Sequence, residues 1–113
     1  MSGTDELDQR VLAVVGRIPP GRVLSYGDVA ALAAAPTPRE VGQVLARHGE
    51  GVPWWRVLHA DGTPPAHLRE RQLALLRAEG TAMAPYGGAV DLASARWEAA
   101  PDPDPQQPSL FDP

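Results

Sequence analysis

The side chains that most often carry out chemistry are sparse in this chain. It has no cysteine, and therefore neither a thiol nucleophile nor a thiolate zinc site. The three histidines, at positions 48, 59 and 67, share no ligand spacing on one helix face, so no metal ion or other cofactor is expected. Ser25 and Thr37 are better explained as helix caps than as nucleophiles. These observations give little support to an enzyme.

The stretch from Val52 to Val57 is unusual because it places Trp54 beside Trp55, two of only six aromatic residues in the chain. Neighbouring side chains of an extended segment point to opposite faces, so both indoles can be core only if the segment is covered on both sides. One interpretation puts one tryptophan in the core and one at its rim. The other is that one indole lines a pocket. The local pattern favours the first.

Length and hydropathy limit the class of protein. A chain of 113 residues can form one domain with one core. No apolar run approaches the roughly 20 residues that span a bilayer, and the N-terminus is too acidic and polar for a signal peptide. We therefore expect a monomeric cytoplasmic protein without a membrane partner.

The net charge of −4 conceals an uneven distribution. Residues 1–8 carry three acids and residues 98–113 carry four, and neither segment contains a basic residue. Residues 9–97 hold ten basic residues, all arginine, against seven acids, which is a net charge of +3. A basic centre rich in arginine is compatible with a nucleic-acid surface. A GC-rich genome would produce the same preference for arginine over lysine.

Capping signals predict two helices before residue 36. Thr4 is expected to cap a helix whose apolar residues recur at helical spacing until Pro19-Pro20-Gly21 ends it. Ser25, with Asp28 three residues later, predicts a second helix that ends before Pro36.

The clearest local signal is Thr37-Pro38-Arg39-Glu40, which combines an N-cap threonine, proline at the first helical position and glutamate at the third. A third helix is expected from Pro38 to about His48, with Gly49 as its C-cap. Two short helices joined by a tight connection form a helix-turn-helix, whose second helix usually presents its N-terminal residues to DNA.

Two residues of this third helix are unfavourable where they stand. Arg39 places a positive charge in the first turn, where the helix dipole disfavours cations, and Gly42 lies mid-helix at a cost of about 1 kcal/mol relative to alanine. A DNA-binding surface would explain both, the glycine through close approach of another backbone. Pairing of Arg39 with an acid, or packing of a helix against Gly42, would also explain them. Taken separately, each structural explanation is favoured.

The second half of the chain predicts a small β component. Residues 57–59 are expected to form a strand, followed by a tight hairpin or wing turn at Asp61-Gly62. Residues 89–92 are expected to form a final strand that Trp97 anchors.

One further helix is expected over residues 66–79, where Gly80 closes an amphipathic pattern. The predicted fold is therefore mainly α with a small β wing, a winged helix-turn-helix DNA-binding domain over residues 1–97. An acidic, proline-rich disordered tail is expected over residues 98–113.

Four motifs occur in order along the chain: Ser25-Tyr26-Gly27, Arg39-Glu40-Val41-Gly42, Pro53-Trp54-Trp55-Arg56-Val57 and Leu75-Leu76-Arg77-Ala78-Glu79-Gly80. Together they resemble the C-terminal DNA-binding domain of the O6-alkylguanine-DNA alkyltransferases. The resemblance covers about residues 7 to 80. Four ordered motifs make it more specific than a shared winged-helix architecture would be.

The motif at residues 53–57 departs from that family. Alkyltransferases have Pro-Cys-His-Arg, in which the cysteine takes the alkyl group and the histidine, linked to a glutamate matched by Glu79, helps to ionise it. Trp54 and Trp55 replace these two residues, and indole is neither a nucleophile nor a base at neutral pH. With tryptophan in the cysteine position, the chain resembles the alkyltransferase-like proteins. These proteins bind O6-alkylguanine without repairing it and pass it to nucleotide excision repair.

The resemblance implies roles for individual residues. Tyr26 matches the tyrosine that crowds the phosphate 3′ to the target nucleotide and promotes its rotation. Arg39 matches the arginine finger that fills the gap in the base stack, and Gly42 the glycine where the recognition helix approaches the minor groove. The lesion pocket would be formed by the residues of the tryptophan motif: Pro53, Trp54, Trp55, Arg56 and Val57.

Within that motif Trp54 is the stronger pocket candidate, because the position of Trp55 usually faces inward toward the glutamate. His67 and Arg69 are candidates for reading the edge of the flipped base, and the sequence does not choose between them. The resemblance thus implies a non-enzymatic protein that binds O6-alkylguanine in double-stranded DNA through the minor groove, flips the nucleotide and flags it for nucleotide excision repair proteins. The alternative is a winged-helix transcription regulator that binds undamaged DNA.

The sequence after Ala99 has a separate character. Residues 101–105 form an acidic linker of alternating proline and aspartate, which cannot build a core. Residues 107–111, Gln-Pro-Ser-Leu-Phe, resemble the bacterial sliding-clamp-binding peptide Gln-Leu-Ser/Asp-Leu-Phe except at the second position. Gln107, Leu110 and Phe111 are therefore candidate contacts to the clamp.

Overall fold

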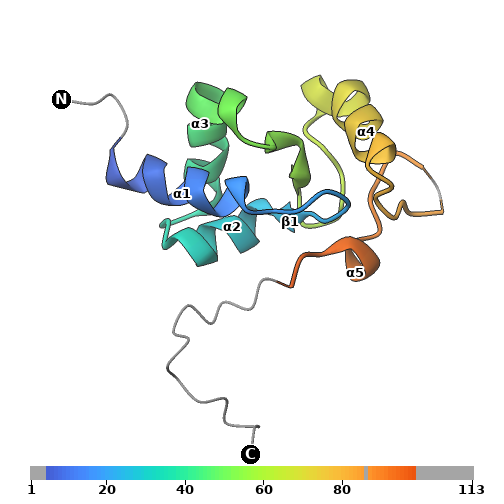
Figure 1. Ribbon diagram of the computed structural model, residues 1–113, viewed down its shortest axis with the longest axis horizontal. Helices are drawn as coiled ribbons and strands as arrows, with labels where there is room; N and C mark the ends of the chain where they lie inside the picture. Colours follow the sequence, from blue (N-terminus) through green and yellow to red (C-terminus); the bar gives the residue numbers. More distant parts are fainter. Residues whose placement is uncertain (1–4, 86, 99–113) are drawn as a thin grey trace, which may run out of the picture.

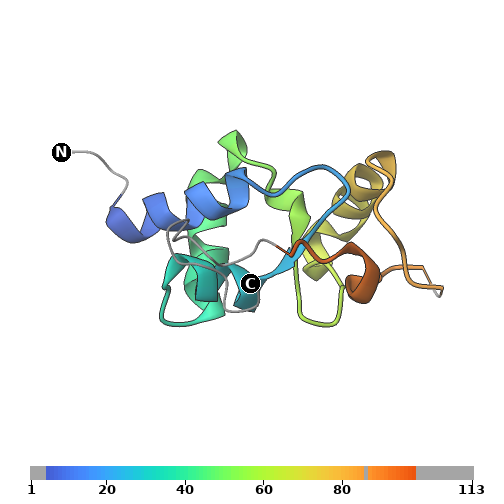
Figure 2. The same cartoon turned by 60° about the horizontal axis from the view of Figure 1, so that its bottom comes forward.

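The computed structural model describes residues 5–85 and 87–98. Thr4 and the whole candidate clamp-binding segment lie outside the described residues. In the described part, α1 (Glu6–Gly16), α2 (Tyr26–Ala33) and α3 (Pro38–His48) pack together on one side of the molecule. Helices α4 (Arg69–Ala78) and α5 (Leu92–Ala95) lie on the other side, with two short strands between the groups (Figure 1, Figure 2).

The helix caps follow the sequence signals closely. Both predicted capping boxes are present, one joining Ser25 and Asp28 at α2 and one joining Thr37 and Glu40 at α3. Gly49 caps the C-terminus of α3 as predicted. At α1 the cap is Asp5, one residue later than expected, because its carboxylate accepts the Asp8 backbone N–H at 2.9 Å.

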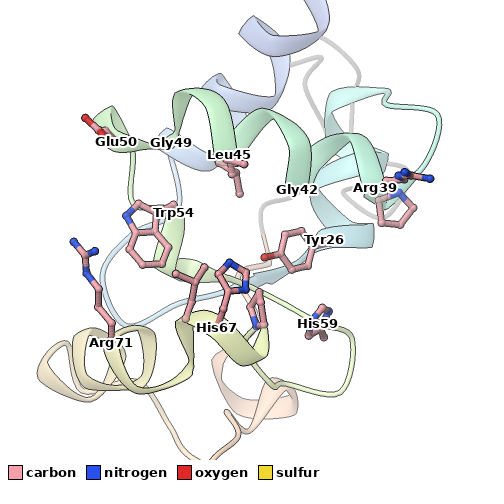
Figure 3. A pocket seen from close by; sticks show the side chains of 14 residues that line it. Tyr26, Arg39, Gly42, Leu45, Gly49, Glu50, Trp54, His59, His67 and Arg71 are labelled. Atoms are coloured by element: carbon pink, nitrogen blue, oxygen red, sulfur yellow. The ribbon is translucent and has the colours of Figure 1, made fainter.

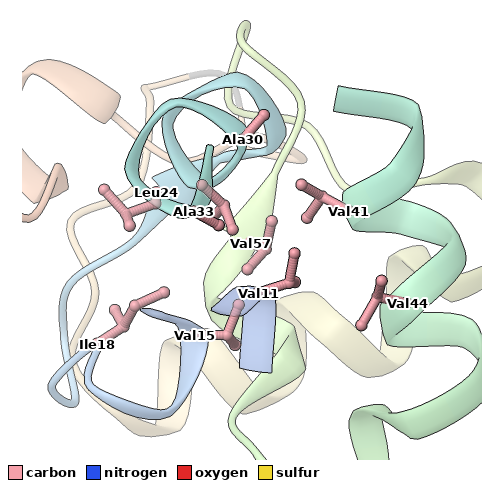
Figure 4. Packing of buried hydrophobic residues seen from close by; sticks show 10 residues of the cluster. Val11, Val15, Ile18, Leu24, Ala30, Ala33, Val41, Val44 and Val57 are labelled. Atoms are coloured by element: carbon pink, nitrogen blue, oxygen red, sulfur yellow. The ribbon is translucent and has the colours of Figure 1, made fainter. Parts of the chain in front are cut away.

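A core of small apolar side chains fills the space between the first three helices (Figure 4). Its buried members are Val11, Val15, Ile18, Leu24, Val29, Ala30, Ala33, Val41, Val44 and Val57. An ion cluster reinforces the contact between α1 and α3: Asp8, only 3% exposed, lies 3.1 Å from the Arg47 guanidinium and 3.3 Å from the His48 imidazole. The orientation of α3 is therefore set by apolar packing and by this cluster at its C-terminal end.

The two strands pair in parallel, which corrects the expected hairpin. Strand β1 (Leu24–Ser25) lies beside β2 (Val57–Leu58), so the partner of β2 comes from far earlier in the chain. The turn at Asp61-Gly62 does form, with the His59 N–H donating to the Thr63 carbonyl at 2.9 Å, but no second strand follows it in the described residues.

The tryptophan motif is not extended, contrary to expectation. Residues Trp54–Arg56 form the 3₁₀ turn η2 directly before β2. The helix expected over 66–79 also begins differently, as a separate 3₁₀ turn η3 (Ala66–Leu68) that leads into α4. Gly80 follows α4 with a positive φ of 77°, as expected for a residue that closes a helix.

The expected strand at 89–92 is wrong, since Val90 makes only an isolated bridge with Met83 and Leu92 begins α5. Trp97 is nevertheless an anchor: its side chain packs against the first core, and its N–H donates to the Val23 carbonyl at 2.8 Å. The mainly α fold with a helix-turn-helix and a small β component is confirmed. None of the helices in the described residues is long and apolar enough to cross a membrane.

Candidate nucleic-acid interface

A cleft of about 800 Å³ opens between α3 and the start of α4. Its volume lies within the range of ligand pockets, about 300–1,000 Å³. Figure 3 shows side chains from both walls pointing into it. The lining residues are Tyr26, Pro38, Arg39, Gly42, Leu45, Ala46, Gly49, Glu50, Trp54, His59, Pro65, His67, Leu68 and Arg71.

Tyr26 lies at one end of the cleft and is the first residue of α2. The Ser25 hydroxyl accepts the Asp28 N–H at 2.9 Å and fixes the start of that helix. Burial raises the pKa of the Tyr26 phenol, so the side chain is a neutral hydrogen-bonding group near pH 7. Its ring centroid lies 5.4 Å from that of His59, with the two planes tilted by 44°.

Arg39 and Gly42 line the same end of the cleft from α3. Arg39 is exposed, and no salt bridge involves it among the described residues, which removes the explanation by pairing with an acid in that part of the chain. A Cβ built on Gly42 would have the Tyr26 ring at 4.0 Å as its nearest neighbour. Packing within the described part of the protein therefore leaves room for the methyl group of an alanine at position 42.

Trp54 lines the opposite end of the cleft, close to the C-terminus of α3. The Arg71 guanidinium lies 5.5 Å from the Trp54 ring centroid, in range of a cation–π contact. Glu50 is the one acidic residue in the lining. The half-buried indole thus offers a large apolar surface whose immediate charged neighbour is an arginine.

Trp55 points away from this surface and takes a structural role. Its indole N–H donates to the Glu79 carboxylate at 3.0 Å. Its ring packs against a second cluster of buried apolar residues, which are Val23, Leu58, Leu76, Val90 and Ala95. Arg56 is 9% exposed and binds the same carboxylate, with its Nε donating to Oε1 at 2.9 Å, and it also donates to the Ile18 carbonyl. Burial alone would raise the pKa of Glu79, but the hydrogen bonds from Arg56 and Trp55 and the charge of Arg56 outweigh it and hold that pKa below its usual value.

Helix α4 holds the tryptophan turn from behind through Gln72. The buried Gln72 amide donates to the carbonyls of Trp55 and Val57, at 2.9 and 2.7 Å. These bonds fix η2 against β2, so that Trp54 is presented to the cleft by a rigid support.

The predicted pocket residues are therefore only partly brought together. Of the five residues of the tryptophan motif, the structure places Trp54 in the cleft lining and leaves out Pro53, Trp55, Arg56 and Val57. His67 lines the cleft as well as a smaller hollow beside it, whereas Arg69 lines only the hollow. His67 is the better placed of the two proposed base readers.

The ten arginines fall into two groups by their contacts. Arg10, Arg22, Arg47, Arg56 and Arg96 donate to carbonyl or carboxylate groups of the fold. Within residues 5–85 and 87–98 no such contact is seen for the other five, of which Arg39, Arg69 and Arg71 lie at the cleft or the hollow beside it. Guanidinium groups at these three positions are suited to phosphate.

Several lining residues were not predicted from the sequence, notably Leu45, Glu50, His59 and Arg71. One signal was available for α3, because Arg39, Gly42, Ala46 and Gly49 recur at helical spacing and so share one face. No comparable pattern marks His59 or Arg71, which reach the cleft through the parallel strand pairing and the start of α4.

Comparison with known proteins assigns the family. The family model described as the 6-O-methylguanine DNA methyltransferase, DNA binding domain, matches residues 6–81. The chain belongs to this family. The resemblance inferred from four motifs over about residues 7 to 80 is thereby confirmed. As a member of the methyltransferase DNA-binding family, this chain is notable for having no cysteine.

Two relatives of this chain are named DNA base-flipping proteins. A DNA base-flipping protein of Escherichia coli (strain K12) is 44% identical over 104 residues, which is 86% of this chain and 78% of the relative. A DNA base-flipping protein of Vibrio parahaemolyticus is 33% identical over 99 residues, 83% of this chain and 98% of the relative.

Solved structures of the same family superpose on the fold. One is S. pombe Atl1 in complex with damaged DNA containing O6-carboxymethylguanine, which is 30% identical to this chain with a TM-score of 0.72. The match covers 86% of this chain and 99% of the Atl1 chain. A variant of the M. tuberculosis O6-methylguanine methyltransferase is 35% identical with a TM-score of 0.58, over 74% of this chain and 53% of its own.

Proposed function

We propose that this protein recognises O6-alkylguanine in double-stranded DNA by flipping the damaged nucleotide into the cleft, without removing the alkyl group. The observation that carries the proposal is Trp54 in the cleft of a chain that has no cysteine. An indole can contact an alkyl group through its apolar face, but it cannot accept that group as a nucleophile. The names of the base-flipping relatives and the damaged DNA bound to Atl1 support the same function.

In this proposal, one end of the cleft rotates the nucleotide out of the duplex and the other end binds the flipped base. Gly42 lets α3 approach the minor groove, and the exposed Arg39 enters the base stack as the nucleotide leaves it. Tyr26 crowds the adjacent phosphate and favours rotation. Unstacking a base costs a few kcal/mol, which the hydrogen bonds and charge of an inserted arginine partly offset.

The flipped base is held at the other end. Trp54 contacts the O6-alkyl chain, and His67, which also lines the cleft, meets the edge of the base. Because no reaction ends the complex, the bound protein persists as a mark on the lesion. We propose that nucleotide excision repair proteins recognise that mark. With a purified bacterial excision nuclease, the protein should raise incision of a duplex that contains O6-alkylguanine, and unchanged incision would refute this step.

One binding experiment tests recognition and chemistry together. The full chain is titrated against a duplex with one O6-methylguanine and against the same duplex with guanine, and the recovered DNA is analysed by mass spectrometry. We expect tighter binding to the lesion with the methyl group intact, and a Trp54→Ala variant should lose most of that preference. Equal affinity for both duplexes would favour the transcription-regulator alternative. Loss of the methyl group would show that the protein is an enzyme.

A further inference from the structure

His59 lies at the Tyr26 end of the cleft and has no role in the flipping scheme above. It is exposed, it lines the cleft, and its ring lies 5.4 Å from the Tyr26 ring. Figure 3 shows it on the loop that faces the N-terminal end of α3, where Arg39 lies. A histidine in a cleft that is proposed to hold DNA is a candidate ligand for a phosphate oxygen.

The parallel strand pairing explains why His59 meets Tyr26. Ser25 and Leu58 are paired residues at the ends of β1 and β2. Each is followed directly by a cleft residue, Tyr26 after Ser25 and His59 after Leu58. Because parallel strands end at the same edge of a sheet, the two rings leave that edge side by side.

The loop that carries His59 is held in one conformation. The Gly62 N–H donates to the His59 carbonyl at 2.9 Å, and the Val90 N–H donates to the Gly62 carbonyl at 2.9 Å. Gly62 has a φ of 87°, and a Cβ there would lie 2.3 Å from the Val90 carbonyl oxygen, so glycine is required. The backbone that carries the imidazole is therefore fixed by hydrogen bonds within the protein.

We propose that His59 binds the backbone phosphate that Tyr26 crowds, so that its protonation strengthens DNA binding as the pH falls. This inference rests on the proposed function for the location of the DNA. A neutral imidazole donates one hydrogen bond, whereas an imidazolium donates two and adds a positive charge next to the phosphate. Charge-assisted hydrogen bonds of this kind are about twice as strong as neutral ones.

The charged and titratable groups around His59 come from its own turn and from α2, α3 and η3. Burial raises the pKa of Tyr26 on α2, so the phenol does not ionise near neutral pH. The pKa of Asp61, in the same turn, is lowered chiefly by the Thr63 side-chain hydrogen bond and to a smaller extent by the charge of His59. The Asp61 Oδ1 accepts from the Thr63 hydroxyl at 2.6 Å and from the Thr63 N–H at 3.0 Å. The Arg39 guanidinium on α3 and the His67 ring on η3 line the same cleft.

The test compares the full-length wild type with His59→Gln and His59→Arg at about pH 5.5 and about pH 7.5. Fluorescence anisotropy is measured with the O6-methylguanine duplex and with the guanine duplex. Wild-type affinity should rise about tenfold at the lower pH, and the glutamine variant should lose this rise. The arginine variant, which is always charged, should bind tightly at both pH values. In His59→Gln at the lower pH, the dependence of log K on log salt should weaken by about one ion.

His48→Gln serves as the matched control, because it removes an imidazole that pairs with Asp8 and does not line the cleft. It should keep the pH dependence, and thermal melting of each variant confirms folding. Retention of the pH effect in His59→Gln, or its loss in His48→Gln, would overturn the inference. Failure of the proposed function would be seen separately, as equal wild-type affinity for the two duplexes, because phosphate contacts do not discriminate between bases.

Discussion

Trp54 and Trp55 show how adjacent residues of one type come to differ in role. The 3₁₀ turn η2 sets the two rings edge to face at 5.8 Å, with one indole in the cleft and the other bonded to Glu79. The indole N–H of Trp55 donates to the Glu79 carboxylate. In the alkyltransferases that the tryptophan motif resembles, the matching carboxylate is linked to a histidine. We infer that the support of the former reactive site is kept while its nucleophile is replaced by an apolar surface.

Arg39 carries the first prediction at the scale of a residue. Arg39→Ala should weaken binding to the O6-methylguanine duplex about tenfold or more, because a charge-assisted contact in the vacated stack is lost. The free energy of unfolding should hardly change, since Arg39 is exposed and unfavourable to the helix dipole. Anisotropy titration and thermal melting measure the two quantities.

Arg77→Ala is the matched control for this experiment. Arg77 is also exposed and makes no ion pair in the described residues, but it does not line the cleft. It should leave lesion binding within about twofold of wild type. A drop in melting temperature confined to Arg39→Ala would instead return that residue to a structural role.

At the scale of elements, the two capping boxes were predicted from the local sequence, whereas the tertiary contacts were not. The boxes at Ser25 and Thr37 form because each is closed by hydrogen bonds within four residues. The β1–β2 pairing and the turn at Trp54–Arg56 depend on partners distant in sequence, such as Gln72. Period and propensity contain no information about such partners, so the cleft residue His59 could not be predicted.

The Arg56–Glu79 pair joins η2 to the end of α4. Because of this pair, we expect the free energy of unfolding to depend on pH. The folded-state pKa of Glu79 lies below its unfolded value of about 4.3, so its stabilisation is fully present above that pH. It is lost as the pH falls through the lower, folded-state pKa. Urea unfolding between about pH 6 and pH 3 should therefore show a falling free energy of unfolding.

Glu79→Gln isolates this contribution from that of other carboxylates. Removing the carboxylate leaves the Arg56 guanidinium buried without its partner, which costs about 3 kcal/mol near neutral pH. The difference from wild type should shrink as the pH falls below the unfolded-state pKa of about 4.3, because the stabilisation by the Glu79 carboxylate is lost toward its lower folded-state pKa. Glu50→Gln, at an exposed position, should show no such convergence, and a constant difference at all pH values would contradict the assignment.

At the scale of the whole molecule, acidic and basic residues occupy different parts of the chain. Arg39 and Arg71 line the cleft formed by α2, α3 and the start of α4, while residues 1–8 and 98–113 are acidic. We expect a phosphate backbone to repel these acidic segments. A segment that DNA repels would be available to a protein partner.

The final prediction concerns that segment. We propose that residues 107–111 bind the bacterial sliding clamp, with Gln107, Leu110 and Phe111 as contacts. A chain that ends at Pro105, and a full-length chain with Leu110→Ala and Phe111→Ala, should both lose retention of purified clamp in a pull-down. Both should bind the O6-methylguanine duplex as the wild type does, because the residues that line the cleft are unchanged. Equal retention of the clamp by all three chains would remove this partner and leave the lesion-binding domain to act without it.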